Sequence, residues 1–355
     1  MSLTVLSVAY PLAAVGPDAV GGAEQVLTLL DRALVQAGHR SVVVACEGSQ
    51  TAGTLVSVPM ERDVLDDAAK AAAHARHRRA IAAALNRWPV DLVHMHGIDF
   101  HAYLPPPGVP VLVTLHLPPG WYPEGCLTPD RPNTWLHCVS ASQARACPSG
   151  ARLLPPIENG VATDDLAARH AKRRFALTLG RICPEKGFHI ALDAARRADM
   201  SLLVAGEVFR YDAHERYFET EIRPRLDHRR RFLGPLGFVR KRRLMTAARC
   251  VVVPSLAPET SSLVAMEALA CGTPVVAFPS GALADIVEHG RTGFLVRDEH
   301  EMADAMEAAD RLDPEVCRAV ARQRFPFERM LGRYFASYRD LARSAATRSL
   351  LPGTA

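Results

Sequence analysis

Short apolar runs and amphipathic stretches alternate along this chain. The runs at Thr4–Ala9 and Ser41–Cys46 predict buried strands. Between them, apolar residues recur with the period of about 3.6 residues that is typical of a helix, and Gly38 marks the end of that helix. This alternation predicts an α/β fold built on parallel sheets.

The same pattern continues through the rest of the chain. Further strands are predicted at 91–97, 109–115, 135–140, 175–180, 201–205, 231–233, 249–253 and 275–278, and a short helix at 141–146. Beyond Asp298 the pattern predicts helices only, the last from about Phe325 to Ala345.

Length and composition limit the class of protein. At 355 residues the chain is too long for one ordinary core, so it suits two domains of roughly 150 to 200 residues each. Its net charge is only +4. The basic runs at 228–231 and 240–243 lack interleaved aromatic residues, so we interpret them as solvated faces. We therefore expect no nucleic-acid partner.

The eight cysteines form no CxxC pair and no zinc-finger spacing. Most of them lie in apolar strand or helix contexts, which predicts reduced thiols in a cytoplasmic protein. The first residues, MSLTVLSVAYPLA, have no basic leader, so we interpret them as a strand and not as a signal peptide. No stretch approaches the roughly 18 apolar residues that span a membrane.

The candidate chemistry is concentrated in Pro254–Phe278. A helix is predicted over Leu263–Ala270, ended by Cys271–Pro274 and followed by a short apolar strand. Three hydroxyl residues can cap that helix: Thr260, Ser261 and Ser262.

Two glutamates flank the start of this helix. Its free backbone N–H groups, near Leu263 and Val264, form a site for an anion such as a phosphate. Glu267, about one turn further on, is placed to accept hydrogen bonds from ribose hydroxyls, and Glu259 precedes the helix where it could meet a sugar. Either acid alone would more often be an ordinary surface glutamate, so the weight rests on their spacing, with seven residues between them.

This segment resembles the E-x7-E element of retaining glycosyltransferases with the GT-B fold, in particular glycosyltransferase family four. The runs ALACGTPVVAF and SGALADIVEHGRTGFLV match the pattern of that family almost without a gap. The resemblance covers almost the whole chain and is weakest at 50–90 and 117–135. It implies an α/β chain of two Rossmann-like domains facing a central cleft, which transfers a sugar from a UDP- or GDP-sugar to an acceptor hydroxyl with retention.

The resemblance also implies the domain boundaries. Ile157–Val161 is similar to the family's linker turn. Residues 1–156 would then form an N-terminal acceptor domain and 157–324 a C-terminal domain for the nucleotide sugar. The helix at 325–346 would cross back onto the first domain.

A second motif follows the strand at 175–180. Gly180–Gly187 matches the family's G-R-x4-K-G element, in which Arg181 and Lys186 grip the nucleotide diphosphate. Two fixed cations can neutralise a diphosphate without a metal. Since the chain has no D-x-D motif, we expect neither metal nor cofactor. Retention would follow a front-face route in which the leaving phosphate helps to deprotonate the acceptor.

The resemblance assigns further contacts outside these two segments. His116, at the end of a strand, would contact the donor sugar, and the backbone near Gly234 would border the nucleobase. Gly21 and Gly22, before the first helix, would let the backbone approach the donor, with Ser262 adding to the donor site. Apart from the resemblance, a strand-end histidine is more often structural, and glycines before a helix can merely permit a turn. The first loop lacks GxGxxG, so a nicotinamide or flavin reading loses support.

The acceptor is expected to be a sugar, a lipid-linked sugar or a small metabolite. The long Pro- and Gly-rich loop from Leu117 to Asn133 is the candidate for its recognition. An Ala-rich helix predicted at 64–88 carries several basic residues, as do helices that touch membranes in related enzymes. A solvated helix is favoured because alanine buries little area, but weak membrane-surface contact stays open.

One departure from the family pattern keeps two rival functions open. The chain has Glu259-Thr260-Ser261-Ser262 where the family commonly has an E-x-F-G run. A glycoside phosphorylase could use the same fold, with free phosphate in the diphosphate site. A non-catalytic nucleotide-sugar-binding protein is the second alternative.

Overall fold

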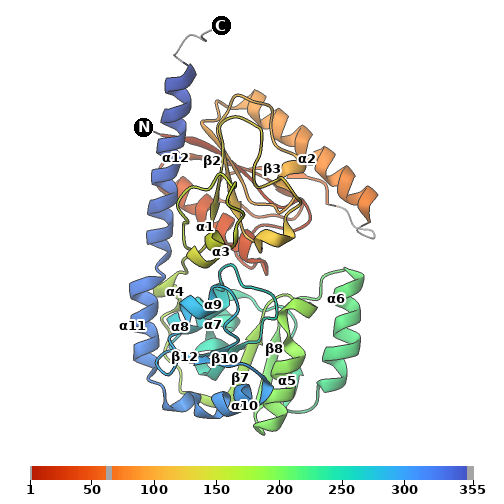
Figure 1. Cartoon of the computed structure of the whole chain (residues 1–355), viewed down its shortest axis with the longest axis vertical. Helices are drawn as coiled ribbons and strands as arrows, with labels where there is room; N and C mark the ends of the chain where they lie inside the picture. The colour runs from red at the N-terminus through yellow and green to blue at the C-terminus, as the bar shows by residue number, and fades with distance from the viewer. Residues whose placement is uncertain (1, 61–65, 350–355) are drawn as a thin grey trace. The chain divides into compact units, whose positions relative to one another are not determined.

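The computed structural model describes residues 2–60 and 66–349. The chain divides into two compact units: unit 1 comprises Met1–Glu158 and Met330–Ala355, and unit 2 comprises Asn159–Arg329. Each unit contains one six-stranded sheet in which all paired strands are parallel (Figure 1).

Unit 1 is built on a sheet with the strand order β3-β2-β1-β4-β5-β6, which is the order of Rossmann folds. Its strands are β1 (Thr4–Val8), β2 (Arg40–Cys46), β3 (Thr54–Val58), β4 (Leu92–Met95), β5 (Val111–Leu115) and β6 (Thr134–Cys138). Its helices are α1 (Gly22–Gln36), α2 (Asp67–Arg87), α3 (Ala141–Ala146) and, from Met330 on, α12 (Phe327–Ser349), with short turns of 3-10 helix at η1 (Phe100–Ala102) and η2 (Pro119–Trp121).

Two elements of unit 1 differ from their predictions. Strand β3 was not predicted, because only one of its five residues is buried and its pattern lacks a strong apolar run. Helix α2 begins at Asp67, and Asp66 is its N-cap: the Asp66 side chain accepts a hydrogen bond from the Ala69 amide. The predicted start at residue 64 lies outside the described residues. One face of α2 is buried, through Ala73, His77, Ile81 and Ala84.

Unit 2 repeats the Rossmann order in its own strands, β12-β11-β10-β7-β8-β9. Its strands are β7 (Arg173–Leu179), β8 (Ser201–Ala205), β9 (Arg230–Phe232), β10 (Ala248–Val253), β11 (Val275–Ala277) and β12 (Gly293–Leu295). Its helices are α4 (Thr163–Leu166), α5 (Phe188–Arg197), α6 (Asp212–Tyr217), α7 (Phe238–Ala247), α8 (Leu263–Ala270), α9 (Leu283–Ile286), α10 (Glu299–Ala308) and α11 (Pro314–Arg324), with short turns at η3 (Pro184–Lys186), η4 (Phe218–Ile222), η5 (Arg223–Arg225) and η6 (Ala309–Arg311).

The sheet of unit 2 is buried on both faces. Successive residues of β7 enter opposite cores: Leu177 packs in the cluster that contains Leu269 of α8, and Ala176 in the cluster that contains Phe188 of α5. Parallel sheets covered on both faces favour continuous apolar strands. This explains why short apolar runs were sufficient to predict most of these strands.

In both units the strand order reverses beside the first strand, between β1 and β4 and between β7 and β10. Parallel strands end at the same edge of a sheet, and ligands of open α/β folds bind outside that carboxyl edge, at the point of reversal. The functional residues are therefore expected on the loops that follow these four strands.

Two wider predictions can be compared with the structure. All eight cysteines are free thiols, and all except Cys147 are buried. Among the helices of residues 2–60 and 66–349, none combines the length and apolar character needed to cross a membrane.

Candidate functional site

The loops after β7 and β10 run side by side at the reversal point of unit 2. The Leu256 amide in the second loop donates a 2.8 Å hydrogen bond to the Glu185 carbonyl in the first. Gly187 ends the first loop with a φ of +63°, and a Cβ there would lie 2.3 Å from the carbonyl oxygen of Pro254. Only glycine permits that conformation at that distance without strain. The backbone thus fixes the two loops against each other.

An ion pair joins these loops. Lys186 Nζ lies 2.6 Å from Glu259 Oε1, and the hydroxyl of Ser255 donates to the same oxygen. The side chain of Glu259 is only 11% exposed. Burial alone would raise the pKa of Glu259, but Lys186, Ser255 and the charge of Arg181 together hold that pKa below its ordinary value. Glu259 is therefore a buried carboxylate at neutral pH.

Arg181 lies close enough to act on this pair. Its charge contributes to the lowered pKa of Glu259 and also to that of His214 on α6. The structure thus brings three of the predicted catalytic residues, Arg181, Lys186 and Glu259, into one neighbourhood of unit 2. The resulting group holds two cations and one anion, an arrangement with net positive charge.

Helix α8 begins directly after this loop. Ser262 is its N-cap, and the Ser262 hydroxyl accepts from the Ala265 amide at 3.4 Å. The helix has the predicted bounds, Leu263–Ala270. In any helix the first amides lack an intrahelical partner, and here these belong to the half-buried Leu263 and Val264. In the sequence, both residues follow shortly after Glu259.

Glu267 on α8 forms a second ion pair, which is largely buried. Lys241 Nζ on α7 lies 2.6 Å from Glu267 Oε1, and the two side chains are 14% and 10% exposed. The prediction that the basic run at 240–243 is a solvated face is wrong for Lys241. Only one side of α7 faces solvent, so Arg240 and Arg243 are exposed whereas Lys241 turns toward α8.

Glycines line the carboxyl ends of the neighbouring strands. Gly206, after β8, has a φ of +144°, and a Cβ there would lie 1.8 Å from the carbonyl oxygen of Gly180, after β7. The Gly206 amide donates to the carbonyl of Gly234, after β9, at 2.9 Å. Gly234 itself has a φ of +69° with open space around it. The residue predicted to border a nucleobase therefore lies at this edge of the sheet.

In unit 1, the predicted glycines lie at the start of α1. Gly21 is the N-cap and Gly22 the first helical residue. A Cβ on Gly21 would lie 1.9 Å from a carboxylate oxygen of Glu24, so that side chain occupies the space above the glycine. An acidic group in the first turn is favourable for the helix dipole.

His116 follows β5, where it was predicted, and is half-buried. Its Nε2 lies 3.0 Å from Nδ1 of His96, which follows β4, and the two rings stack with centroids 5.3 Å apart. Burial, and then the nearby His137, lower the pKa of His116 to about 3. Burial and His116 likewise lower the pKa of His96 well below its ordinary value. Both imidazoles are therefore neutral at pH 7.

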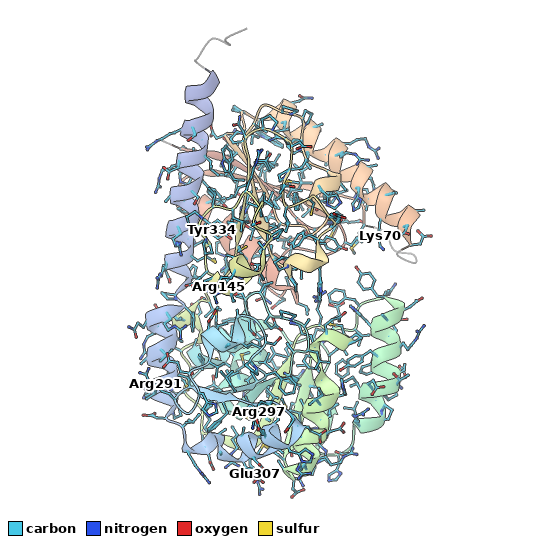
Figure 2. All side chains as sticks on the ribbon, viewed as in Figure 1. Lys70, Arg145, Arg291, Arg297, Glu307 and Tyr334 are labelled. Atoms are coloured by element: carbon cyan, nitrogen blue, oxygen red, sulfur yellow. The ribbon has the colours of Figure 1, made fainter. Side chains whose placement is uncertain are left out.

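A buried polar network ties α12 to the sheet of unit 1. His94 Nδ1 bonds the hydroxyl of Tyr338 at 2.8 Å, and His94 Nε2 bonds Thr114 Oγ1 at 2.7 Å. Thr114 Oγ1 also bonds His137 Nε2 at 2.7 Å and the hydroxyl of Tyr334, labelled in Figure 2, at 3.3 Å. Each of these hydroxyls and rings is buried, so the network satisfies polar groups that water cannot reach.

Sequence reasoning missed two members of the unit 2 site. Ser255 lies directly after β10 and before the predicted acidic loop, and its place at a strand end was the available signal. Lys241 gave no such signal, because a basic residue within a basic run looks the same whether it pairs with an acid or faces water. Both contacts arise from tertiary structure.

Two family models match the chain. "Glycosyltransferase Family 4" matches residues 20–151 and "Glycosyl transferases group 1" matches residues 173–309. They correspond to the two units, apart from the chain ends and the segment between them.

Named relatives give the same classification. The chain is 43% identical over 99 residues to a D-inositol 3-phosphate glycosyltransferase of Pseudarthrobacter chlorophenolicus, a match covering 26% of this chain and 23% of the relative. It is 31% identical over 183 residues to a phosphatidyl-myo-inositol mannosyltransferase of Mycobacterium leprae, covering 48% and 46%. The chain thus matches less than half the length of these two relatives.

Solved structures match over nearly the whole chain. A sucrose-phosphate synthase from Thermosynechococcus elongatus has a TM-score of 0.79 at 20% identity, covering 96% of this chain and 100% of that one. HepE of Anabaena in complex with UDP-glucose has a TM-score of 0.70 at 19% identity, covering 97% and 100%. At such identities the likeness shows the fold.

Two Rossmann-ordered parallel sheets, with these structural matches, define a protein of the GT-B fold. The chain belongs to glycosyltransferase family four, as the two family models show.

Proposed function

We propose that this protein is a retaining glycosyltransferase that moves a sugar from a nucleotide-diphosphate sugar to an acceptor hydroxyl. The observation that carries the proposal is the half-buried Lys186–Glu259 ion pair, with Arg181 beside it, at the reversal point of the unit 2 sheet. The family's own activity supports it.

In this proposal the diphosphate binds the positive side of the group. Lys186 has three N–H donors, of which Glu259 takes one, leaving the others for phosphate oxygens. Arg181 adds a planar donor fork, and the first amides of α8 add a partial positive charge. These groups stabilise the leaving diphosphate most when the glycosidic bond is largely broken, so no metal is assigned to this step.

The two glutamates would then recognise the sugars of the donor. Glu259 is ionised and fixed by Lys186 and Ser255, so it is suited to hold sugar hydroxyls or to stabilise a cationic ring. Lys241 donates a hydrogen bond to Oε1 of Glu267. The other carboxylate oxygen of Glu267 would accept a hydrogen bond from a ribose hydroxyl. His116 of unit 1 would contact the transferred sugar as a neutral imidazole.

The donor is proposed to be a UDP- or GDP-sugar. HepE, which shares the fold, binds UDP-glucose, and two relatives act on inositol-containing acceptors according to their names. The acceptor is proposed to be a hydroxyl of a sugar, a lipid-linked sugar or a small metabolite such as an inositol phosphate. Front-face retention would let the leaving phosphate take the acceptor proton.

A ligand screen followed by a product assay tests the proposal. Because a ligand that binds the folded state raises the melting temperature, one of UDP, GDP or ADP should stabilise wild-type protein more than the others. The matching nucleotide sugar should then give a glycosylated product and free nucleoside diphosphate, with the anomeric configuration retained.

Three further arms separate the alternatives. Sugar phosphate formed from inorganic phosphate would instead show a glycoside phosphorylase. Tight nucleotide binding with neither transfer nor hydrolysis across the acceptor panel would show a binding protein. Transfer should persist in excess chelator; complete loss that magnesium or manganese restores would overturn the metal-free assignment.

A further inference from the structure

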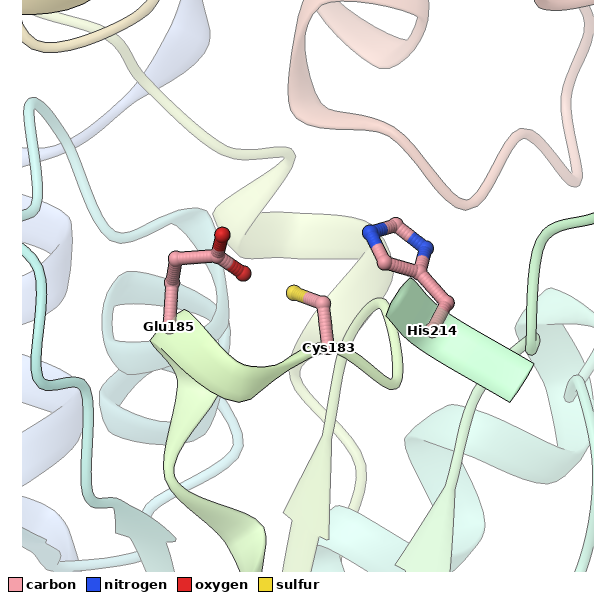
Figure 3. Close-up of side chains that lie close together, drawn as sticks. All are labelled: Cys183, Glu185 and His214. Carbon is pink, nitrogen blue, oxygen red and sulfur yellow. The ribbon is translucent and has the colours of Figure 1, made fainter. Parts of the chain in front are cut away.

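Three side chains of unit 2 bring together a sulfur, a carboxylate and an imidazole. Cys183 and Glu185 belong to the loop after β7, and His214 lies on α6. Their ligand atoms all lie within 4.8 Å of one another. Figure 3 shows the sulfur of Cys183 between the carboxylate of Glu185 and the ring of His214. Over residues 2–60 and 66–349, this is the one group of three such side chains that converges in this way.

The imidazole of His214 turns its Nε2 toward the sulfur of Cys183, and its Nδ1 lies on the far side of the ring (Figure 3). Burial, and then the charge of Arg181, lower the pKa of His214, so the ring is neutral at pH 7. A neutral imidazole is the commonest protein ligand for metals.

We propose that Cys183, Glu185 and His214 bind a divalent transition metal of the zinc class, with water in a fourth position. Thiolate sulfur, imidazole nitrogen and carboxylate oxygen are the ligands that zinc prefers. Around a tetrahedral zinc ion with bonds of about 2.0–2.3 Å, ligand atoms lie roughly 3.3–3.8 Å apart. The present separations, all within 4.8 Å, therefore need to close by at most about 1.5 Å on binding, which rotation of the Glu185 and His214 side chains can provide.

The charges around the site balance the ion. Burial raises the pKa of the Cys183 thiol to about 11; the hydrogen bond to Glu185 adds to that rise, and Arg181 and Lys186 oppose it. Metal binding displaces the thiol proton, and the resulting thiolate and carboxylate match the two positive charges of the ion. Arg181 and Lys186 repel it, although Lys186 is already paired with Glu259.

The ion would join α6 to the loop after β7. Cys183 and Glu185 lie between Arg181 and Lys186 in the same loop, but the ion takes no part in the reaction proposed above. Cysteine spacing could not reveal the site, because its imidazole comes from a separate helix and its set contains a single cysteine. The fold supplies the proximity.

Cobalt titration of tag-free, metal-depleted wild-type protein tests the proposal directly. One Co²⁺ per chain should bind, with the near-ultraviolet charge-transfer absorption of a thiolate ligand, and Zn²⁺ should displace it. Cys183→Ser should abolish that absorption. The control Cys126→Ser changes a thiol of unit 1 and should leave it intact.

A second variant keeps the proposal testable if Cys183→Ser fails to fold. His214→Ala should keep the fold and weaken Zn²⁺ affinity by at least about 100-fold, because removing a direct ligand should cost no less than altering the groups that orient a ligand, which costs about 10–100-fold. The exposed imidazole of His228 serves as its control, because His228→Gln should bind like the wild type. Wild-type protein that takes up no metal, or variants that match it in stoichiometry and affinity, would overturn the proposal.

The pH dependence of affinity provides a further measurement. Because one thiol proton leaves per ion and the imidazole is already neutral, Zn²⁺ affinity should rise about tenfold per pH unit between about pH 7 and 9. A flat profile would show that Cys183 is not a ligand. None of these measurements requires nucleotide or turnover, so the site can fail while the transferase proposal stands.

Discussion

The two sheets share one strand order, but the polar groups at their carboxyl edges differ in charge. In unit 1 the strand ends carry four neutral histidines, of which His94, His96 and His137 are buried and His116 is half-buried. In unit 2 the corresponding edge and the helix beside it carry two ion pairs, Lys186–Glu259 and Lys241–Glu267.

This difference separates what the fold fixes from what the residues decide. The strand order places both sets of side chains at comparable edges. In unit 1, the hydroxyls of Tyr338 and Thr114 and the carbonyl of Cys138 bond the ring nitrogens of His94 and His137, and Thr114 also bonds Tyr334. Because Tyr334 and Tyr338 belong to α12, much of that network serves to hold this helix. In unit 2, the charges keep unused donors and acceptors beside a helix N-terminus, which suits an anionic ligand.

The largest expected effect is that of low pH, which should unfold unit 1 before unit 2. The unfolded chain protonates its histidines near pH 6.5, whereas burial lowers the pKa of His137 to about 4 in the folded unit. The stability that the neutral ring contributes is present above pH 6.5 and is lost as the pH falls toward 4. For His137 alone the loss at pH 4 is on the order of 3 kcal/mol, and its three neighbours add to it.

The three tryptophans report this loss selectively. Trp88, Trp121 and Trp135 all belong to unit 1, so their fluorescence should change at a higher pH than hydrogen exchange in peptides of unit 2. The lowered pKa of Glu259 keeps its pair intact until the pH falls below its ordinary value of 4.5. His137→Gln should reduce the proton uptake of unfolding by about one; an unchanged pH dependence would contradict the assignment.

A glycine substitution should break unit 2 alone. Alanine at Gly206 would adopt a φ of +144° with its Cβ 1.8 Å from the carbonyl of Gly180. Backbone strain and overpacking together should cost about 4 kcal/mol. Urea unfolding followed by hydrogen exchange in unit 2 measures this cost.

Gly234→Ala is the matched control. Its φ is also positive, at +69°, but the space around it is open, so strain alone should cost about 1 kcal/mol. Equal losses for the two variants would show that the close approach to Gly180 is unimportant.

Much of this architecture could be predicted from local sequence signals. Helix α8 has its predicted bounds because a serine cap and a glycine after its end are both local features. Strand β12 was missed because its three residues begin with a glycine, which leaves only two apolar side chains in the run. Predicted strand ends also shifted by one or two residues, as expected where pairing sets the boundary.

Site residues could be predicted from the sequence only where they stand in a segment that is recognisable by itself. Arg181, Lys186 and Glu259 stand in recognisable segments that precede or follow strands, and the structure brings them together. Lys241 and His214 come from helices that reach the site through tertiary structure, so no spacing in the sequence indicated them. The roles of the predicted residues in binding and catalysis stay predictions.

Substitutions at the charged edge, meaning the carboxyl edge of the unit 2 sheet with its ion pairs, should lower activity without unfolding unit 2. Arg181→Ala and Glu259→Gln should each lower turnover by about 100-fold, equivalent to about 2.7 kcal/mol in the activation barrier. Steady-state assays with the donor from the ligand screen measure the effect. The control Glu207→Gln changes an exposed carboxylate after β8 and should turn over like the wild type. Near-wild-type rates in Arg181→Ala or Glu259→Gln would remove that residue from the mechanism.

The variants with the smallest expected effect test whether the neutral edge, meaning the histidine-bearing carboxyl edge of the unit 1 sheet, has a structural role. Tyr338→Phe leaves the buried Nδ1 of His94 without its 2.8 Å partner, which should cost about 1–3 kcal/mol. Tyr334→Phe removes only a 3.3 Å bond to Thr114, whose hydroxyl keeps two shorter ones, so it should cost about 0.5–1 kcal/mol. Urea unfolding followed by tryptophan fluorescence should rank the variants in that order, with nucleotide affinity unchanged in both. If Tyr334→Phe were the more damaging, His94 would not be the main attachment of α12. If either variant weakened nucleotide binding, the neutral edge would share in the function assigned to the charged one.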